Sequence, residues 1–190
     1  MAILALAEAG RPKMRKLSRV VRPTGIERSF DPDEIIVSKT DVAGRITYAN
    51  RVFQRVAGFD EAELLGAPHS IVRHPDMPRC VFKLLWDQLA EGHEVFAYVK
   101  NLCRSGDHYW VFAHVTPSLD LGGSLLGYHS SRRVPKRDVV EATIEPLYRA
   151  LLEEESRHDD RKAGMASAFG MLLKLLEEKG VGYDELVLSL

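Results

Sequence analysis

One short stretch of the chain, residues 69–82, holds most of the side chains that could bind a ligand. It reads HSIVRHPDMPRCVF and contains two histidines, two arginines, one aspartate and two prolines. Each proline lacks a backbone donor and restricts the residue before it, so a regular helix cannot cross the span. We therefore expect Arg73, His74 and Asp76 on a rigid, irregular turn just before a helix N-terminus, where they could bind an anionic ligand. The alternative is a capped surface turn without a ligand.

Each of these three polar side chains also has a structural role that competes with ligand binding. Arg73 is a fixed cation that could offset the negative charge of a ligand, or it could form an ion pair with Asp76. His74 titrates near neutral pH and could donate to a ligand, or it could cap the turn. Asp76 could orient Arg73 or His74, or it could be the N-cap of the following helix.

The composition is that of an ordinary globular protein, with 45% hydrophobic and 28% charged residues among 190. A net charge of −1 argues against nucleic-acid binding. Two cysteines, Cys80 and Cys103, cannot make a disulfide framework, and reduced thiols are typical of the cytoplasm.

No apolar run reaches the roughly 18–20 residues of a membrane span. Residues 1–9 are apolar but precede their charges, which is the wrong order for a secretory signal. We therefore expect a cytoplasmic protein.

The sequence divides into three segments. Residues 1–28 form a basic N-terminal extension, with seven Arg or Lys against two Glu. This extension could contact a membrane surface or an acidic partner, or it could be a solvated leader. Residues 29–135 form the expected central domain. Residues 136–190 form a C-terminal helical extension for output or dimerisation.

Hydrophobic periodicity predicts an α+β fold for the central segment. Strands are expected at 35–49 (a hairpin), 95–102, 108–116 and 125–131, with helical segments at 51–57, 60–65 and 81–89. This order predicts one antiparallel sheet with helices on one face, and a small-ligand cavity between the two. Trp86 falls on the apolar face of the third helix, where it could line that cavity or belong to the plain core.

Two helices are expected in the C-terminal extension. Residues 136–155 form the first, and Pro146 predicts a kink or a break in it. Residues 161–179 form the second, which carries an apolar stripe. The stripe could fold back on its own domain, or it could bind a second copy or a receptor helix. It consists of Met165, Phe169, Leu172, Leu173 and Leu176.

Several motifs resemble those of PAS domains. YANRVFQRVAGFDEAELLG at 48–66 and KNLCRSGDHYWV at 100–111 resemble two signatures of that family. VRHPDMP at 72–78 and EPLYRAL at 145–151 are similar to motifs of the aerotaxis or energy-taxis receptor subclass. The resemblance covers about residues 31–152. It implies a PAS fold with a five-stranded antiparallel sheet, whose pocket holds FAD and reports respiratory electron flow.

The resemblance also assigns cofactor-binding residues by position. Arg73, His74 and Asp76 match charged residues linked to flavin binding, and Trp86 matches a helix tryptophan of the same pocket region. Asn101 sits where flavin-binding relatives use an asparagine on the sheet, whose amide could match the pyrimidine edge of an isoalloxazine.

Two positions depart from the family pattern. Many taxis receptors have a tryptophan where this chain has Phe96, which could change how the flavin ring is stacked. Photosensing relatives have a reactive cysteine where the nearest match here is His69, so blue-light adduct chemistry is not expected.

The function implied is a cytoplasmic, flavin-binding redox sensor that signals to a membrane chemoreceptor or another signalling protein. The chain resembles the free-standing PAS half of a split energy-taxis receptor, associated with the membrane through its partner, and a second copy could also be a partner. No nucleophile elbow, phosphate loop or kinase signature is present, so an enzyme is not expected. A cofactor-free interaction module remains an alternative.

Two sites based on histidine were also considered. A haem-binding gas sensor would need an axial ligand such as His93, His114 or His129. A metal site built from the histidines, Asp76 and Cys80 of the central stretch fits no common zinc spacing.

Overall fold

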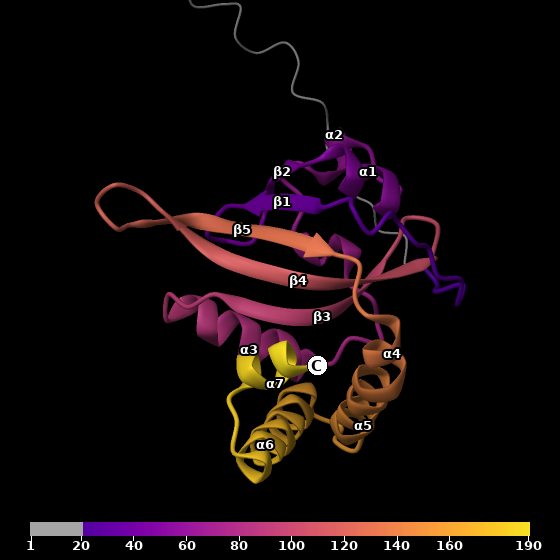
Figure 1. Ribbon diagram of the computed structural model, residues 1–190, viewed down its shortest axis with the longest axis vertical. Helices are drawn as coiled ribbons and strands as arrows, with labels where there is room; N and C mark the ends of the chain where they lie inside the picture. Colours follow the sequence, from indigo (N-terminus) through magenta and orange to yellow (C-terminus); the bar gives the residue numbers. More distant parts are fainter. Residues whose placement is uncertain (1–20) are drawn as a thin grey trace, which may run out of the picture.

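The computed structural model describes residues 21–190, and a five-stranded antiparallel sheet lies at its centre (Figure 1). The spatial order of the strands is β2-β1-β5-β4-β3, so the first and last strands of the domain, β1 and β5, pair in the middle. The strand bounds are β1 Ile36–Thr40, β2 Ile46–Ala49, β3 Val95–Leu102, β4 His108–Leu119 and β5 Leu125–Arg133. The predicted antiparallel sheet is confirmed. The greater part of the basic extension, residues 1–20, lies outside the described residues.

The last residues of the predicted extension pack against the β3–β4 turn. Thr24 N donates to the carbonyl of Gly106 at 2.8 Å, and Glu27 forms a parallel bridge with His108. Gly106 has a φ of +98°, and a Cβ there would lie 2.3 Å from the Arg22 carbonyl oxygen. This close approach requires glycine. Residues 22–28 are therefore in contact with the central domain.

Four short helices connect β2 to β3, namely α1 (Arg51–Ala57), α2 (Glu61–Leu64), the 3-10 helix η1 (His69–Val72) and α3 (Arg79–Ala90). Asn50 caps α1, since its side-chain oxygen accepts from Phe53 N at 2.9 Å. The two prolines keep residues 73–78 out of a helix, as expected, and α3 begins directly after Pro78.

The apolar face of α3 is narrower than the sequence predicts. Val81, Leu84, Leu85 and Leu89 are buried, whereas Trp86 is 42% exposed. The assignment of Trp86 to the plain core is therefore wrong.

The C-terminal extension is helical throughout, and its first helix is interrupted where Pro146 predicts a break. Its elements are α4 (Arg137–Val139), the π-helical turn η2 (Val140–Ile144), α5 (Glu145–Ser156), α6 (Arg161–Lys179) and α7 (Tyr183–Ser189). Pro146 cannot donate to the preceding turn and its ring crowds the carbonyl four residues earlier. The wider π turn just before it accommodates both effects. Among residues 21–190, no helix combines the length and apolarity needed to cross a membrane.

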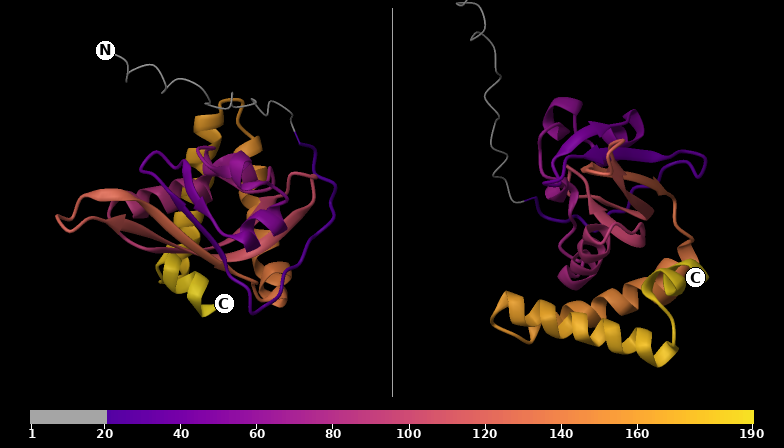
Figure 2. Two further views of the ribbon diagram at one scale, coloured as in Figure 1. Left: turned by 90° about the horizontal axis from the view of Figure 1, so that it is seen from above. Right: turned by 90° about the vertical axis from the view of Figure 1, so that its left-hand side faces the viewer.

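Helices α5 and α6 form a hairpin that folds back on its own domain, beside α3 and β3 (Figures 1 and 2). At Gly164 of α6 an added Cβ would lie 2.3 Å from the Glu155 carbonyl oxygen, so the two helices approach closely there. Leu172 and Leu176 of the apolar stripe are buried, whereas Leu173 is exposed. Of the two arrangements considered for the stripe, the structure shows the folded-back one.

Side chains from the C-terminal helices also cover the edge of β3. Phe96 N donates to Asp184 of α7 at 3.3 Å, and Tyr148 OH of α5 donates to the Tyr98 carbonyl at 2.7 Å. Edge strands with unpaired backbone groups invite non-specific pairing, and this cover prevents it. Tyr148 also lies 6.1 Å from the Trp110 ring. Tyr109 and Trp110 point to opposite faces of β4, and both are buried. The C-terminal helices thus cover the face of the sheet on which Trp110 lies.

Candidate ligand-binding site

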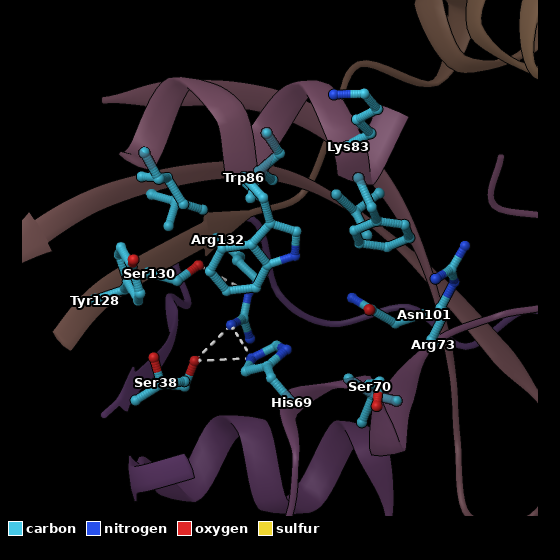
Figure 3. Close-up of a pocket in the computed structure, with 18 of the residues that line it drawn as sticks. Ser38, His69, Ser70, Arg73, Lys83, Trp86, Asn101, Tyr128, Ser130 and Arg132 are labelled. Atoms are coloured by element: carbon cyan, nitrogen blue, oxygen red, sulfur yellow. Dashed lines mark hydrogen bonds between the residues drawn. The ribbon is translucent and has the colours of Figure 1, made fainter. Parts of the chain in front are cut away.

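A cavity of about 410 Å³ lies between α3 and the sheet (Figure 3). This volume is in the range of small-molecule pockets, roughly 300–1,000 Å³. Strands β1, β3, β4 and β5, the 3-10 helix η1 and helices α3 and α6 all contribute side chains. Much of the lining is apolar and includes Phe82, Leu85, Leu89, Val115 and Met165. The enclosed space predicted between sheet and helices is therefore present.

A polar cluster of Ser38, His69 and Arg132 lies at one end of the cavity (Figure 3). Arg132 Nη2 donates to Ser38 Oγ and contacts His69 Nε2 at 2.7 Å, while its Nε donates to Ser130 Oγ at 3.1 Å. Arg132 is only 3% exposed, and no carboxylate pairs with it among residues 21–190. Its Nη1 has no hydrogen-bond partner in this part of the chain, and neither has Oγ1 of Thr40, which also lines the cavity.

The protonation states in this cluster follow from its burial. Burial, reinforced by the charge of Arg132, lowers the pKa of His69 to about 3. Burial also lowers the pKa of Arg132, to about 10. At neutral pH the imidazole of His69 is therefore a neutral acceptor, and Arg132 keeps its charge. A buried cation without a counter-ion is costly, so this arrangement suits a ligand that brings acceptor groups or negative charge.

Asn101 and Arg73 lie together at another part of the lining (Figure 3). Their backbones form an isolated β-bridge, which places the two positions side by side. Asn101 is 4% exposed, and its side-chain amide has no hydrogen bond to any of residues 21–190. The Arg73 guanidinium lies 4.4 Å from the centre of the Phe82 ring, and burial lowers its pKa. The amide and this cation are thus available to a ligand.

Neither His74 nor Asp76 lines the cavity. His74 faces away from it because Arg73 is extended where it pairs with β3, and successive side chains of extended backbone point to opposite sides. His74 is 2% exposed and packs edge-on against His108, with ring centres 5.6 Å apart. Its Nδ1 accepts from Asp76 N at 3.1 Å. Burial lowers the pKa of His74 to about 4, so the expectation that it titrates near neutral pH is wrong.

Asp76 pairs with Lys100 at 2.8 Å rather than with Arg73. Burial would raise the pKa of Asp76, but the hydrogen bond and the charge of Lys100 outweigh it and lower the pKa. The alternative of an Arg73–Asp76 ion pair is therefore wrong. Asp76 is not the N-cap of α3 either, since Cys80 N donates instead to Glu155 Oε1 of α5 at 2.9 Å.

Trp86 lines the cavity from α3. Its ring lies edge-on to Tyr128, 5.3 Å away, and its six-membered ring faces Gly44 in the β1–β2 turn. With 42% of its surface exposed, Trp86 is placed at the rim of the cavity rather than in its depth.

The family of the chain is shown by its match to known proteins. A family model described as PAS fold matches residues 35–130. The chain belongs to the PAS family. The chain is 42% identical over 119 residues to the aerotaxis receptor of Escherichia coli (strain K12), covering 63% of this chain and 23% of that protein. It is 30% identical over 99 residues to a nitrogen fixation regulatory protein of Klebsiella pneumoniae, covering 52% of this chain and 20% of that protein. The chain thus spans less than a quarter of the length of these relatives.

Solved structures confirm the PAS fold. A light-oxygen-voltage domain studied with a flavin analogue matches with a TM-score of 0.52 at 17% identity, covering 61% of this chain and 87% of its own. The light state of the blue-light photoreceptor Aureochrome1 LOV domain matches with a TM-score of 0.52 at 16% identity, covering 59% and 88%.

The polar cluster at Arg132 was missed from the sequence. Strand alternation could have pointed to it, because Ser38, Ser130 and Arg132 all occupy inward-facing positions where apolar residues are expected. What alternation cannot show is that β1 and β5 are neighbours, with Ser38 directly opposite Ser130.

The axial ligands considered for haem lie away from the PAS cavity. None of His93, His114 and His129 lines it. His114 instead pairs with Glu94 at 2.6 Å and stacks on Phe96. His69 does line the cavity, but its Nε2 is engaged by Ser38 and Arg132. The geometry therefore gives little support to the haem alternative.

Proposed function

We propose that this PAS domain binds a flavin, FAD, between its sheet and α3 and acts as a redox sensor for aerotaxis or energy taxis. The observation that supports the proposal most is the buried cation Arg132, which has a donor without a partner among residues 21–190 and lines a largely apolar cavity of about 410 Å³. The 42% identity to an aerotaxis receptor over the PAS domain supports the biological role.

The residues present fit the two chemically different edges of an isoalloxazine. The ring is flat and apolar at one edge, and the lining residues Phe82, Leu85 and Leu89 suit that edge. The pyrimidine edge carries carbonyl and N–H groups, for which the amide of Asn101 offers both an acceptor and donors. Trp86 would cover the ring at the rim of the cavity.

A bound flavin would supply reversible electron transfer, with a change in charge and protonation on reduction. The chain's own contribution is electrostatic. Arg132 holds a positive charge in a site largely removed from water, where it favours the electron-rich form of a neighbouring group. Ser38, Ser130 and neutral His69 hold the guanidinium in place without neutralising it.

His74 and Asp76 would act on this site from outside the cavity. His74 fixes the turn through Asp76 N, and Asp76 ties the turn to β3 through Lys100. Both contacts hold the backbone that presents Arg73. We therefore assign these two residues a positioning role and reserve direct contact with the ligand for Arg73, Trp86, Asn101 and Arg132.

The output would pass through α3 and the C-terminal helices to a signalling partner. Helix α3 lines the cavity and is joined to α5 by the Arg79–Glu155 ion pair of 2.9 Å. A change in the ligand that shifts α3 would thus reach the extension. We propose a membrane chemoreceptor or another signalling protein as the partner, and a cytoplasmic location at the membrane through that partner.

The test is the absorbance spectrum of freshly purified full-length protein, followed by titration of the apoprotein with FAD. We expect a yellow protein whose flavin bands bleach on reduction with dithionite and return in air. Colourless protein that takes up no added FAD would contradict the proposal. A Soret band in place of flavin bands would favour haem instead.

A further inference from the structure

A second hollow, of about 460 Å³, adjoins the mouth of the cavity. Arg73 and Arg79 line both spaces, so the hollow continues the cavity outward. Its far wall comes from the helical hairpin, through Glu155 and Ser156 at the end of α5 and Arg161 at the start of α6. The hollow therefore lies between the PAS domain and its C-terminal extension.

The charges in this hollow do not balance. Arg79 pairs with Glu155, which is 4% exposed and also accepts from Cys80 N. Arg73 and Arg161 form no ion pair with any carboxylate in residues 21–190, and nearby Asp160 is engaged in capping α6. Three guanidinium groups thus face one carboxylate, which leaves an excess of two positive charges.

We propose that this hollow binds the diphosphate of a dinucleotide whose ring occupies the cavity, so that α6 contributes Arg161 to the cofactor site. This inference rests on the flavin-binding function proposed above and adds its anionic subsite. A diphosphate carries the two negative charges that the hollow lacks, and guanidinium groups bind phosphate oxygens in pairs.

The geometry of α6 connects the two spaces. Arg161 and Met165 are four residues apart and so lie on the same face of the helix. Arg161 reaches the hollow and Met165 lines the cavity. One helix face of the extension thus touches both halves of the proposed dinucleotide site, and docking of the hairpin and retention of the dinucleotide stabilise each other.

The experiment compares FAD with riboflavin, which has the same ring but no phosphate, by fluorescence titration of full-length apoprotein. Arg161→Gln should weaken FAD binding about 5- to 10-fold, less than the loss of a buried charge-assisted hydrogen bond because Arg161 is exposed, and leave riboflavin unchanged. Arg157→Gln is the matched control, because Arg157 lies four residues before Arg161, at the end of α5, but pairs with Glu154 and does not line the hollow. It should change neither affinity.

The outcomes separate this inference from the proposed function. If the wild type binds both FAD and riboflavin and Arg161→Gln changes neither affinity, only the diphosphate subsite is overturned. An equal loss of both ligands in Arg161→Gln would also overturn it, because the variant would then act through the fold. A wild type that binds neither ligand would overturn the proposed function and the subsite together.

Discussion

Arginine side chains lie in two regions of the proposed ligand site, inside the cavity and at its mouth beside the outer hollow. The two regions differ in how the positive charge is held. Arg132 is buried, is fixed by Ser38, Ser130 and His69, and has no carboxylate partner among the described residues. Arg73 and Arg161 lie at the mouth, where they are partly or fully exposed. Burial concentrates the field of the first group, whereas water and salt weaken that of the second. Equal formal charges should therefore have unequal effects on a ligand.

The largest effect is expected from the inner arginine. Arg132→Gln removes a charged donor from a desolvated site and should weaken flavin binding about 10- to 100-fold, since a hydrogen bond to a charged group contributes roughly 1.5–3 kcal/mol. The measurement is a flavin titration at low and high salt, and the loss should be nearly independent of salt. Arg133→Gln is the control, because Arg133 is the next residue of β5 and is exposed. A variant at Arg132 that binds flavin like the wild type would remove the basis of the comparison.

A smaller and salt-dependent effect is expected at the mouth. Arg73→Gln should weaken FAD binding about 3- to 10-fold at low salt, and the difference should shrink as ionic strength rises, because this cation is partly solvated. The same titration over a range of salt measures both. A loss as large and as salt-independent as that of Arg132→Gln would show that the two arginine groups act alike.

His74 lies two residues from Asp76 on the side of the turn away from the cavity, so its replacement should separate stability from binding. His74→Ala removes a buried ring and the acceptor of Asp76 N, and we expect a loss of about 1–3 kcal/mol in the free energy of unfolding. Flavin affinity should fall by less than in Arg73→Gln. Urea denaturation and flavin titration of the same samples give both values, and a reversed order would assign His74 to the ligand.

The last effect is one of pH, and it concerns the inner region. The pKa of His69 is lowered to about 3 in the folded protein, whereas in the unfolded chain it keeps its usual value of 6.5. Below pH 6.5 the unfolded chain therefore binds a proton at His69 more readily than the folded protein does. Stability is therefore full above pH 6.5 and is lost as the pH falls toward 3. We expect the Tm of the apoprotein to fall by roughly several degrees from pH 7 to pH 5. His69→Gln should flatten that dependence, and an unchanged slope would mean that burial beside Arg132 does not hold His69 neutral.

The sequence alone was sufficient for the five strands, for most of the helices and for the family, although the 3-10 helix η1 and the last helix, α7, were not predicted. Runs of β-prone residues predicted β3, β4 and β5, and two prolines predicted the irregular turn before α3. The helix was expected at residues 81–89, and it begins two residues earlier, at Arg79. These features depend on residues close together in the chain, where backbone restriction and periodicity act directly. The same local signals, with the PAS signatures, placed Arg73, Trp86 and Asn101 near a cavity.

Tertiary structure decided which polar groups meet. Arg132 and Ser38 are 94 residues apart, and only the pairing of β1 with β5 joins them. Glu155 caps α3 across 75 residues, and only the folded-back hairpin brings it there. The sequence could not show which side His74 faces, because that depends on how its extended neighbour Arg73 pairs with Asn101 of β3. Local periodicity reports which residues share a face of one element, but contacts between distant elements depend on sheet order and helix docking.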